Sequence, residues 1–252
     1  MSDRVLATLE RGVLTGTLNR PDKKNAIDTP MIDGLLGLLE RAELDAGVRV
    51  VVLRGAGEDF CAGMDLQELL ASADRTVAEN RDAALHFGGV FVRLRAIPKP
   101  IVAVVRGRAL AGGCGLATAC DLVLAAESAT FGYPEVQRGF VPALVMNLLR
   151  RAVGEKTGFD LAATGRLLSA REAERIGLVS RVYPDESLEE GVAEVLRTLT
   201  SISTSSLALT KQQFYRLDGV PFEEGIRMSA DVNAVSRTTP EFRAAIAAFL
   251  KQ

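Results

Sequence analysis

Apolar and polar residues alternate along residues 5–18 around Arg11-Gly12, a pattern that predicts a β-hairpin. Over residues 29–46 the apolar positions recur at helical spacing, which predicts a helix with one buried face. Two apolar segments rich in β-branched residues follow at 50–55 and 100–105, each typical of a strand buried on both faces. The chain therefore begins as a hairpin and continues as alternating strands and helices.

This alternation predicts a parallel sheet with crossover helices. We expect helices from Leu66, over 84–94 and near Gly115, and a strand over 121–125. Further helices are expected over 143–153, 156–164 and 170–176, and a late strand over 178–183. After Leu188 the pattern is helical, with breaks near 201–206 and 219–221. The predicted organisation is a core of residues 1–197 and a helical region of residues 198–252.

Glycines gather where the strand at 100–105 gives way to the next helix, in the sequence Ala109 to Gly115. Glycines let a ligand approach the backbone, and a helix N-terminus offers unpaired N–H groups to an anion. A second turn of this kind, residues 59–66, follows the strand at 50–55. Two such turns can supply two N–H donors to one oxygen. The alternatives are simple turn geometry at Gly63 and Gly112, or a phosphate site, although no complete dinucleotide fingerprint is present.

Glu135 follows the apolar sequence Phe131-Gly132-Tyr133-Pro134. Apolar surroundings favour a raised carboxyl pKa, which suits a general acid or base. A solvated charge or a helix-capping partner is the ordinary alternative for a lone glutamate. Beside two amide donors that stabilise an enolate, Glu135 could exchange a proton on the neighbouring carbon.

At this point the chain resembles the enoyl-CoA hydratase/isomerase (crotonase) superfamily. The resemblance is carried by Asn25-Ala26, by residues 60–66, by Ala111-Gly112-Gly113-Cys114, by Cys120-Asp121 and by residues 131–135. It runs from about Val13 to the C-terminus, with the motifs in family order. It implies an α/β fold, a crotonase-like spiral of β-β-α units with a C-terminal helical region, and assembly as a homotrimer or homohexamer.

The resemblance also implies roles for individual residues. The backbone amides of Met64 and Gly112 would form the oxyanion hole for the thioester carbonyl of an acyl-CoA, and Glu135 would be the catalytic carboxylate. The groove for CoA and its pantetheine arm would include Lys24, Ala26, Ala62, Gly63, Asp65, Leu66, Leu110 and Phe249. Coenzyme A is then part of the substrate, and neither a separate cofactor nor a metal is expected. As alternatives, Lys24 is a solvated loop charge, and Asp65 caps or braces a turn.

Gly115 departs from the two-glutamate hydratases that the chain resembles, which carry a second glutamate at this position. The resemblance is therefore to the single-glutamate branch, which includes isomerases and some hydratases. We expect hydration of a 2-enoyl-CoA, as in fatty acid metabolism. The alternatives are double-bond isomerisation, hydration of a branched or carboxylated acyl-CoA such as a methylglutaconyl-CoA type, and a non-catalytic acyl-CoA binding scaffold.

Composition agrees with a compact enzyme. The 252 residues are 48% hydrophobic and 25% charged, and the net charge of −2 gives no reason to expect binding to nucleic acid or membranes. The three cysteines lack C-x-x-C spacing, and a single histidine, His86, cannot form a metal site alone. The N-terminus does not resemble a signal peptide, so we expect a soluble, cytoplasmic protein.

Overall fold

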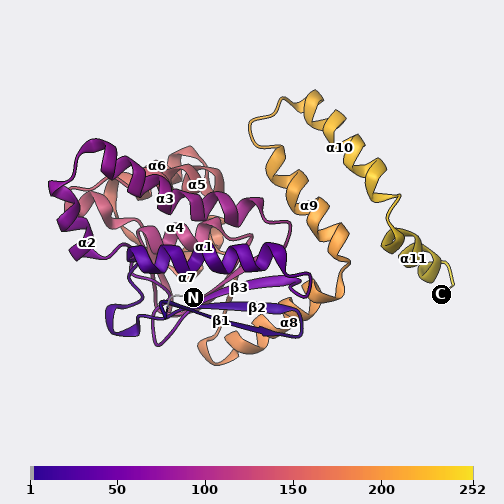
Figure 1. Cartoon of the computed structure of the whole chain (residues 1–252), viewed down its shortest axis with the longest axis horizontal. Coiled ribbons are helices and arrows are strands. Elements are labelled where there is room, and N and C mark those ends of the chain that lie inside the picture. The colour runs from indigo at the N-terminus through magenta and orange to yellow at the C-terminus, as the bar shows by residue number, and fades with distance from the viewer. Residues whose placement is uncertain (1–2, 252) are drawn as a thin grey trace.

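The computed structural model describes residues 3–251, which form an α/β fold with two sheets (Figure 1). The larger sheet has the strand order β1-β2-β3-β4-β6-β9. Only β1 and β2 pair antiparallel, which confirms the predicted hairpin, and the other neighbours pair parallel. The strands are β1 (Val5–Glu10), β2 (Val13–Leu18), β3 (Val50–Gly55), β4 (Ile101–Val105), β6 (Leu122–Ala126) and β9 (Arg181–Tyr183).

A smaller sheet consists of β5 (Arg108–Leu110), β7 (Thr130–Gly132) and β8 (Leu167–Ser169). β5 pairs parallel with β7, and β7 pairs antiparallel with β8. None of these three strands was predicted from the sequence, because three residues are too few to show an alternating pattern.

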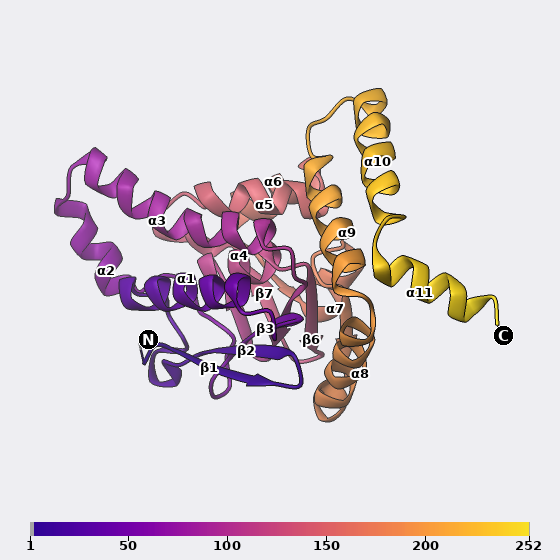
Figure 2. The same ribbon diagram turned by 45° about the vertical axis from the view of Figure 1, so that its right-hand side comes forward.

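Helices cover both faces of the larger sheet (Figure 2). In β3, Val50 and Val52 pack in one apolar cluster with α8 (Leu188–Ser201), whereas Val51 and Leu53 belong to the main core on the opposite face. The main core also holds the buried sides of α1 (Thr29–Leu44), α3 (Val77–Ala96) and α4 (Gly112–Ala119). Burial on both faces explains why the central strands are apolar throughout.

Three predicted elements differ from the structure by three residues or more at one end, and the others by at most two. The helix predicted over 84–94 is the longer α3, which begins at a capping box between Thr76 and Glu79. The helix predicted near Gly115 already begins at Gly112, and the late strand predicted over 178–183 is only β9. The remaining helices before the C-terminal region are α2 (Leu66–Ala71), α5 (Ala143–Val153), α6 (Glu155–Thr164) and α7 (Ala170–Arg175), with 3₁₀ turns η1 (Pro21–Lys23), η2 (Ser72–Asp74), η3 (Pro134–Arg138) and η4 (Asp185–Ser187).

The C-terminal region consists of α9 (Thr204–Arg216), α10 (Phe222–Ser236) and α11 (Pro240–Phe249). The breaks predicted near 201–206 and 219–221 are confirmed, and a third break at 237–239 was not predicted. α9 runs beside the core, whereas α10 and α11 lie outside it (Figures 1 and 2). Among the described residues, no helix has both the length and the apolar character that a membrane crossing requires.

Candidate active site

Main-chain hydrogen bonds bring three loop segments together at one end of the small sheet. Leu110 lies opposite Gly132 in the β5–β7 register, and the Ala111 amide donates to the Gly132 carbonyl at 2.8 Å. On the other side of β5, Cys61 forms a bridge with Ala109, and the Leu110 amide donates to the Cys61 carbonyl at 2.9 Å. The turns after Cys61, after Leu110 and after Gly132 therefore leave adjacent strands at the same edge.

The first two turns are in close contact. A Cβ atom at Gly63 would lie 2.9 Å from the Ala111 Cβ and 3.6 Å from the Gly112 nitrogen. A Cβ atom at Gly112 would lie 3.7 Å from Cγ of Met64. Within residues 3–251, neither the Met64 nor the Gly112 amide donates a hydrogen bond to a protein acceptor. Two unpaired N–H groups thus occupy neighbouring turns.

Ala111, the residue that precedes α4, has φ 51° and ψ −126°. A non-glycine residue in this region is strained by about 1–3 kcal/mol, and such strain tends to persist at functional sites. The same turn sets the direction of the Gly112 amide at the helix N-terminus, where the backbone dipole favours negative charge. The local geometry is therefore suited to an oxygen that develops negative charge.

Glu135 lies on η3, three residues after Gly132, and is only 8% exposed. Its Oε2 atom is buried and has no hydrogen-bond partner in the structure. Burial raises the pKa of the Glu135 carboxyl, and the nearby charge of Arg138 offsets this only in part. Glu135 also acts electrostatically on Cys114 in the first turn of α4, so it lies near the glycine-rich turn.

Three apolar side chains that the sequence analysis did not single out pack on α4 at this site. A Cβ atom at Gly112 would lie 3.2 Å from Cε1 of Phe87, and one at Gly115 would lie 2.2 Å from Cγ1 of Val145 and 3.4 Å from Cζ of Phe91. Phe87 and Phe91 are four residues apart in the predicted helix, so their shared face was visible in the sequence. Val145 gave no such signal.

Comparison with known proteins decides the family. The sequence pattern of the family described as "Enoyl-CoA hydratase/isomerase" matches residues 8–252. The chain belongs to the enoyl-CoA hydratase/isomerase family. A Thermus thermophilus protein, whose name assigns it provisionally to the enoyl-CoA hydratases, is 42% identical over 98% of each chain. The 2,3-dehydroadipyl-CoA hydratase of Escherichia coli is 32% identical over 100% of this chain and 97% of that protein.

The solved structures agree with this family. The crystal structure of an enoyl-CoA hydratase from Mycobacterium smegmatis superposes with a TM-score of 0.95 at 30% sequence identity, over 98% of this chain and 96% of that chain. The two sheets and the C-terminal helices are thus a crotonase fold. An acyl-CoA substrate is what this family implies.

In this member of the hydratase/isomerase family, most of the residues predicted to form the CoA groove lie on two paired segments, 24–27 and 62–66. The Ala62 amide donates to the Lys24 carbonyl at 3.0 Å, and the Ile27 amide donates to the Gly63 carbonyl at 2.8 Å. Lys24 and Leu66 are exposed, whereas Ala26, Ala62 and Leu110 are half-buried. The structure therefore brings these loops together beside the glycine-rich turn.

Asp65 uses its carboxylate inside the protein. Its Oδ1 accepts the Gln67 amide at the start of α2, and its Oδ2 forms an ion pair with Arg20 at 2.9 Å. Burial opposes the charge, but these bonds outweigh it and lower the pKa of Asp65. The Asp65 side chain therefore caps α2 and braces the turn, as the alternative hypothesis predicted. Its ion-pair partner, Arg20, was not predicted from the sequence.

Phe249, in contrast, does not lie with the other predicted residues in one chain. It ends α11 and is 73% exposed. In both views α11 lies at the opposite side of the molecule from α2 (Figures 1 and 2). A contact between Phe249 and a ligand would therefore require the site of another subunit.

The cysteines and the histidine play no visible part at the site. Burial raises the pKa of Cys61 to about 12 and that of Cys114 to about 11, so neither is a ready thiolate. His86 is exposed and pairs with Asp33 at 2.8 Å. Among the described residues, no group of three or more His, Cys, Asp or Glu side chains could hold a metal ion.

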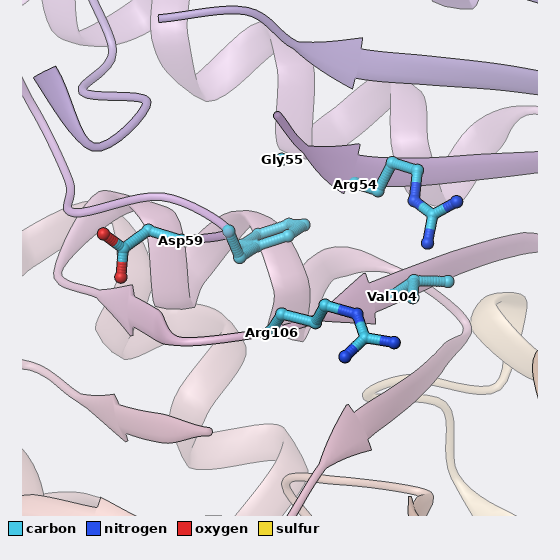
Figure 3. A pocket seen from close by; sticks show the side chains of 6 residues that line it. Arg54, Gly55, Asp59, Val104 and Arg106 are labelled. Carbon is cyan, nitrogen blue, oxygen red and sulfur yellow. The ribbon is translucent and has the colours of Figure 1, made fainter. Parts of the chain in front are cut away.

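Two hollows lie elsewhere on the molecule. The smaller, about 20 Å³, is at the carboxyl ends of β3 and β4, where Arg54 and Arg106 extend to one side and Asp59 points the other way (Figure 3). Glu189 pairs with both arginines, so their charge is already partly neutralised. The larger, about 410 Å³, lies between α5 and α6 beside Phe159. Neither hollow includes Met64, Gly112 or Glu135 among its lining residues.

Proposed function

We propose that the protein catalyses the reversible hydration of a 2-enoyl-CoA to a 3-hydroxyacyl-CoA. The amides of Met64 and Gly112 bind the thioester oxygen and stabilise the enolate, and each well-aimed donor of this kind is worth about 3 kcal/mol to the transition state. Glu135 exchanges the proton on the α-carbon: in hydration its carboxylate takes a proton from the water that adds to the β-carbon and delivers a proton to the α-carbon of the enolate, and dehydration reverses both transfers. The water is held by main chain or by the substrate itself.

The observation that carries this proposal is the buried Glu135 carboxylate with an unpaired oxygen. A buried polar atom without a partner is costly, and structural carboxylates in this chain have partners. An oxygen left without a partner, on the segment that follows Gly132 next to the Ala111–Gly112 turn, is suited to a substrate proton.

The acyl-CoA itself is proposed to lie along the paired loops that carry Lys24, Ala26 and residues 62–66. Lys24 is exposed on the first of these loops, where it can meet an anionic part of CoA. Leu66 and Leu110 offer apolar surface to the pantetheine arm. No further cofactor enters the proposal.

Isomerisation is the second candidate, and Gly115 favours it. The chain has no carboxylate at this position, so it belongs, we propose, to the single-glutamate branch. A single carboxylate suffices to move a proton between two carbons, with no water involved.

The acyl group of the substrate has its own candidates. The similarity to 2,3-dehydroadipyl-CoA hydratase supports a carboxylated substrate, and a branched acyl group of the methylglutaconyl-CoA type is of the same class. A non-catalytic acyl-CoA binding scaffold would show binding without any turnover.

Separate incubation with a 2-enoyl-CoA and a 3-enoyl-CoA tests the proposal. We expect the 2-enoyl-CoA to be converted to 3-hydroxyacyl-CoA. Chromatography of the thioesters detects this product. Double-bond migration without hydration would establish the isomerase instead, and binding without either product would establish the scaffold.

We further propose that residues 198–252 serve assembly, as a homotrimer or homohexamer. The C-terminal helices expose large apolar side chains that a single chain leaves uncovered: Phe214, Phe222, Ile226, Ile246, Phe249 and Leu250. Large apolar side chains left exposed in such number on one region are typical of an interaction surface.

A further inference from the structure

One face of α4 has no side chains where it borders the candidate site. Gly112 and Gly115 are three residues apart and share a face of the helix. A Cβ atom at Gly115 would lie 2.2 Å from Cγ1 and 3.1 Å from Cβ of Val145. Since such short contacts do not occur between packed atoms, position 115 accepts a side chain only if Val145 is displaced.

Val145 belongs to a continuous apolar wall. Phe87 covers Gly112 and Phe91 reaches Gly115, and the centroids of their two rings are 4.7 Å apart. Phe87 and Phe91 are each 5% exposed, and Val145 is 3% exposed. The wall therefore extends along α4 from the amide proposed to bind the thioester oxygen.

Glu135 reaches the site from the segment after β7, not from this wall. The titratable groups beside it are Cys114, Tyr133 and Arg138, of which the first two are buried and uncharged at neutral pH. Arg138 bonds to the Pro134 carbonyl at 3.4 Å. The wall itself, made of Phe87 and Phe91 on α3 and Val145 on α5, presents only hydrocarbon to the glycine face of α4.

We propose that Val145 determines the reaction of this enzyme, because it closes the α4 face at Gly115 so that acid–base chemistry reaches the acyl group from Glu135 alone. This inference rests on the proposed function. It adds that the acyl group packs against the wall of Phe87, Phe91 and Val145. It also implies that a second acid can be introduced at position 115 only when residue 145 is made smaller.

The packing part of the inference is tested without any activity. Thermal unfolding is measured for Gly115→Ala, Val145→Ala and the double variant. We expect Gly115→Ala to lower Tm by about 5 °C or more, and the penalty to shrink markedly when Val145 is already alanine. Equal penalties in both backgrounds would show that Val145 does not close this face.

The chemical part is tested with Gly115→Glu/Val145→Ala against the matched control Gly115→Gln/Val145→Ala. We expect the glutamate variant to hydrate a 2-enoyl-CoA at least about tenfold faster than the glutamine variant, and to add an ionisation to the pH profile of kcat/KM. Equal rates and profiles in two folded variants would overturn the proposal. If the unmodified enzyme converts no enoyl-CoA, the proposed function fails, and with it the role of Val145 in determining the reaction. The Tm comparison still shows whether Val145 closes the α4 face at Gly115.

Discussion

Glu135 differs from other buried carboxylates of this chain in what surrounds its oxygens. Asp59 accepts Nε and Nη2 of Arg108, each at 2.7 Å, and Asp65 accepts Arg20 and a helix amide. In both, burial opposes the charge but the bonds prevail and lower the pKa, whereas burial prevails at Glu135 and raises its pKa. The first two carboxylates are bonded within the protein, whereas Glu135 keeps one oxygen without a partner, as the proposed proton exchange requires.

This difference predicts the pH dependence of turnover. Because the ionised form of Glu135 begins the proposed reaction, kcat/KM should fall as the pH is lowered through the raised pKa. The profile from about pH 4 to about pH 9 gives the midpoint. A midpoint at or below the ordinary pKa of a glutamate would contradict the assignment.

At the scale of elements, the site depends on how closely two turns approach each other. Gly63 has φ +102°, and a Cβ atom there would lie 3.1 Å from the Leu110 carbonyl oxygen. Glycine is needed for both reasons, because the conformation and the space each exclude a side chain. The Met64 amide keeps its position only while this contact is intact.

We therefore expect Gly63→Ala to lower Tm and to reduce kcat at least about tenfold by displacing the Met64 amide. The matched control is Gly219→Ala, which has φ +76° but no neighbouring atom within 4 Å of the added Cβ. Steady-state kinetics measures kcat, and thermal unfolding followed by circular dichroism measures Tm, for both variants. Similar losses in both variants would mean that the backbone conformation, not the contact, is responsible.

A second element-scale interaction holds α9 on the core. Lys211 Nζ lies 2.8 Å from Asp121 Oδ2 and donates to the carbonyls of Leu94 and Lys99, while the Tyr215 hydroxyl donates to Asp121 Oδ1. Burial lowers the pKa of Lys211 and raises that of Asp121, so each group depends on the other to stay charged. The sequence pattern gives no means to pair Asp121 with a residue 90 positions later.

Lys211→Met should destabilise the protein by about 3–5 kcal/mol, because it leaves the Asp121 charge buried without its partner. Urea unfolding measures the loss. Adding Asp121→Asn should recover part of it, since the uncompensated charge is then gone. A double variant as unstable as the sum of the single ones would contradict the pairing.

Long patterned elements were predictable from the sequence, and short elements were not. The hairpin, α1 and the central strands have enough residues to show their periodicity, whereas β5, β7 and β8 have three each. Yet these short strands are what brings Met64, Gly112 and the Glu135 segment together. The resemblance named the residues, and only the register of the small sheet explains why they meet.

For the whole molecule, the largest difference between the sequence-based prediction and the structure is the position of the C-terminal helices. Phe249 was predicted to line the CoA groove, but α11 lies across the molecule from α2, which begins at another predicted groove residue, Leu66 (Figure 2). Contacts between chains leave no trace in the pattern of one chain. The apolar side chains on α10 and α11 are the surface on which the proposed assembly depends.

The full chain should elute as a trimer or hexamer in size-exclusion chromatography with light scattering. Phe222→Glu/Phe249→Glu should shift it to smaller species, because burying these charges in an interface is costly. Leu44→Glu, an exposed position on α1, is the control and should leave the assembly unchanged. A monomeric full chain would refute the assembly role of the C-terminal region.

The most direct test of the catalytic role of Glu135 compares Glu135→Gln with the unmodified protein in turnover and in binding of the same acyl-CoA. The amide keeps the shape of the side chain and removes a buried charge, so Tm at neutral pH should not fall. We predict that turnover falls roughly a hundred- to ten-thousand-fold while Kd changes by no more than about threefold. An unchanged rate in a folded, ligand-binding variant would contradict the role of Glu135.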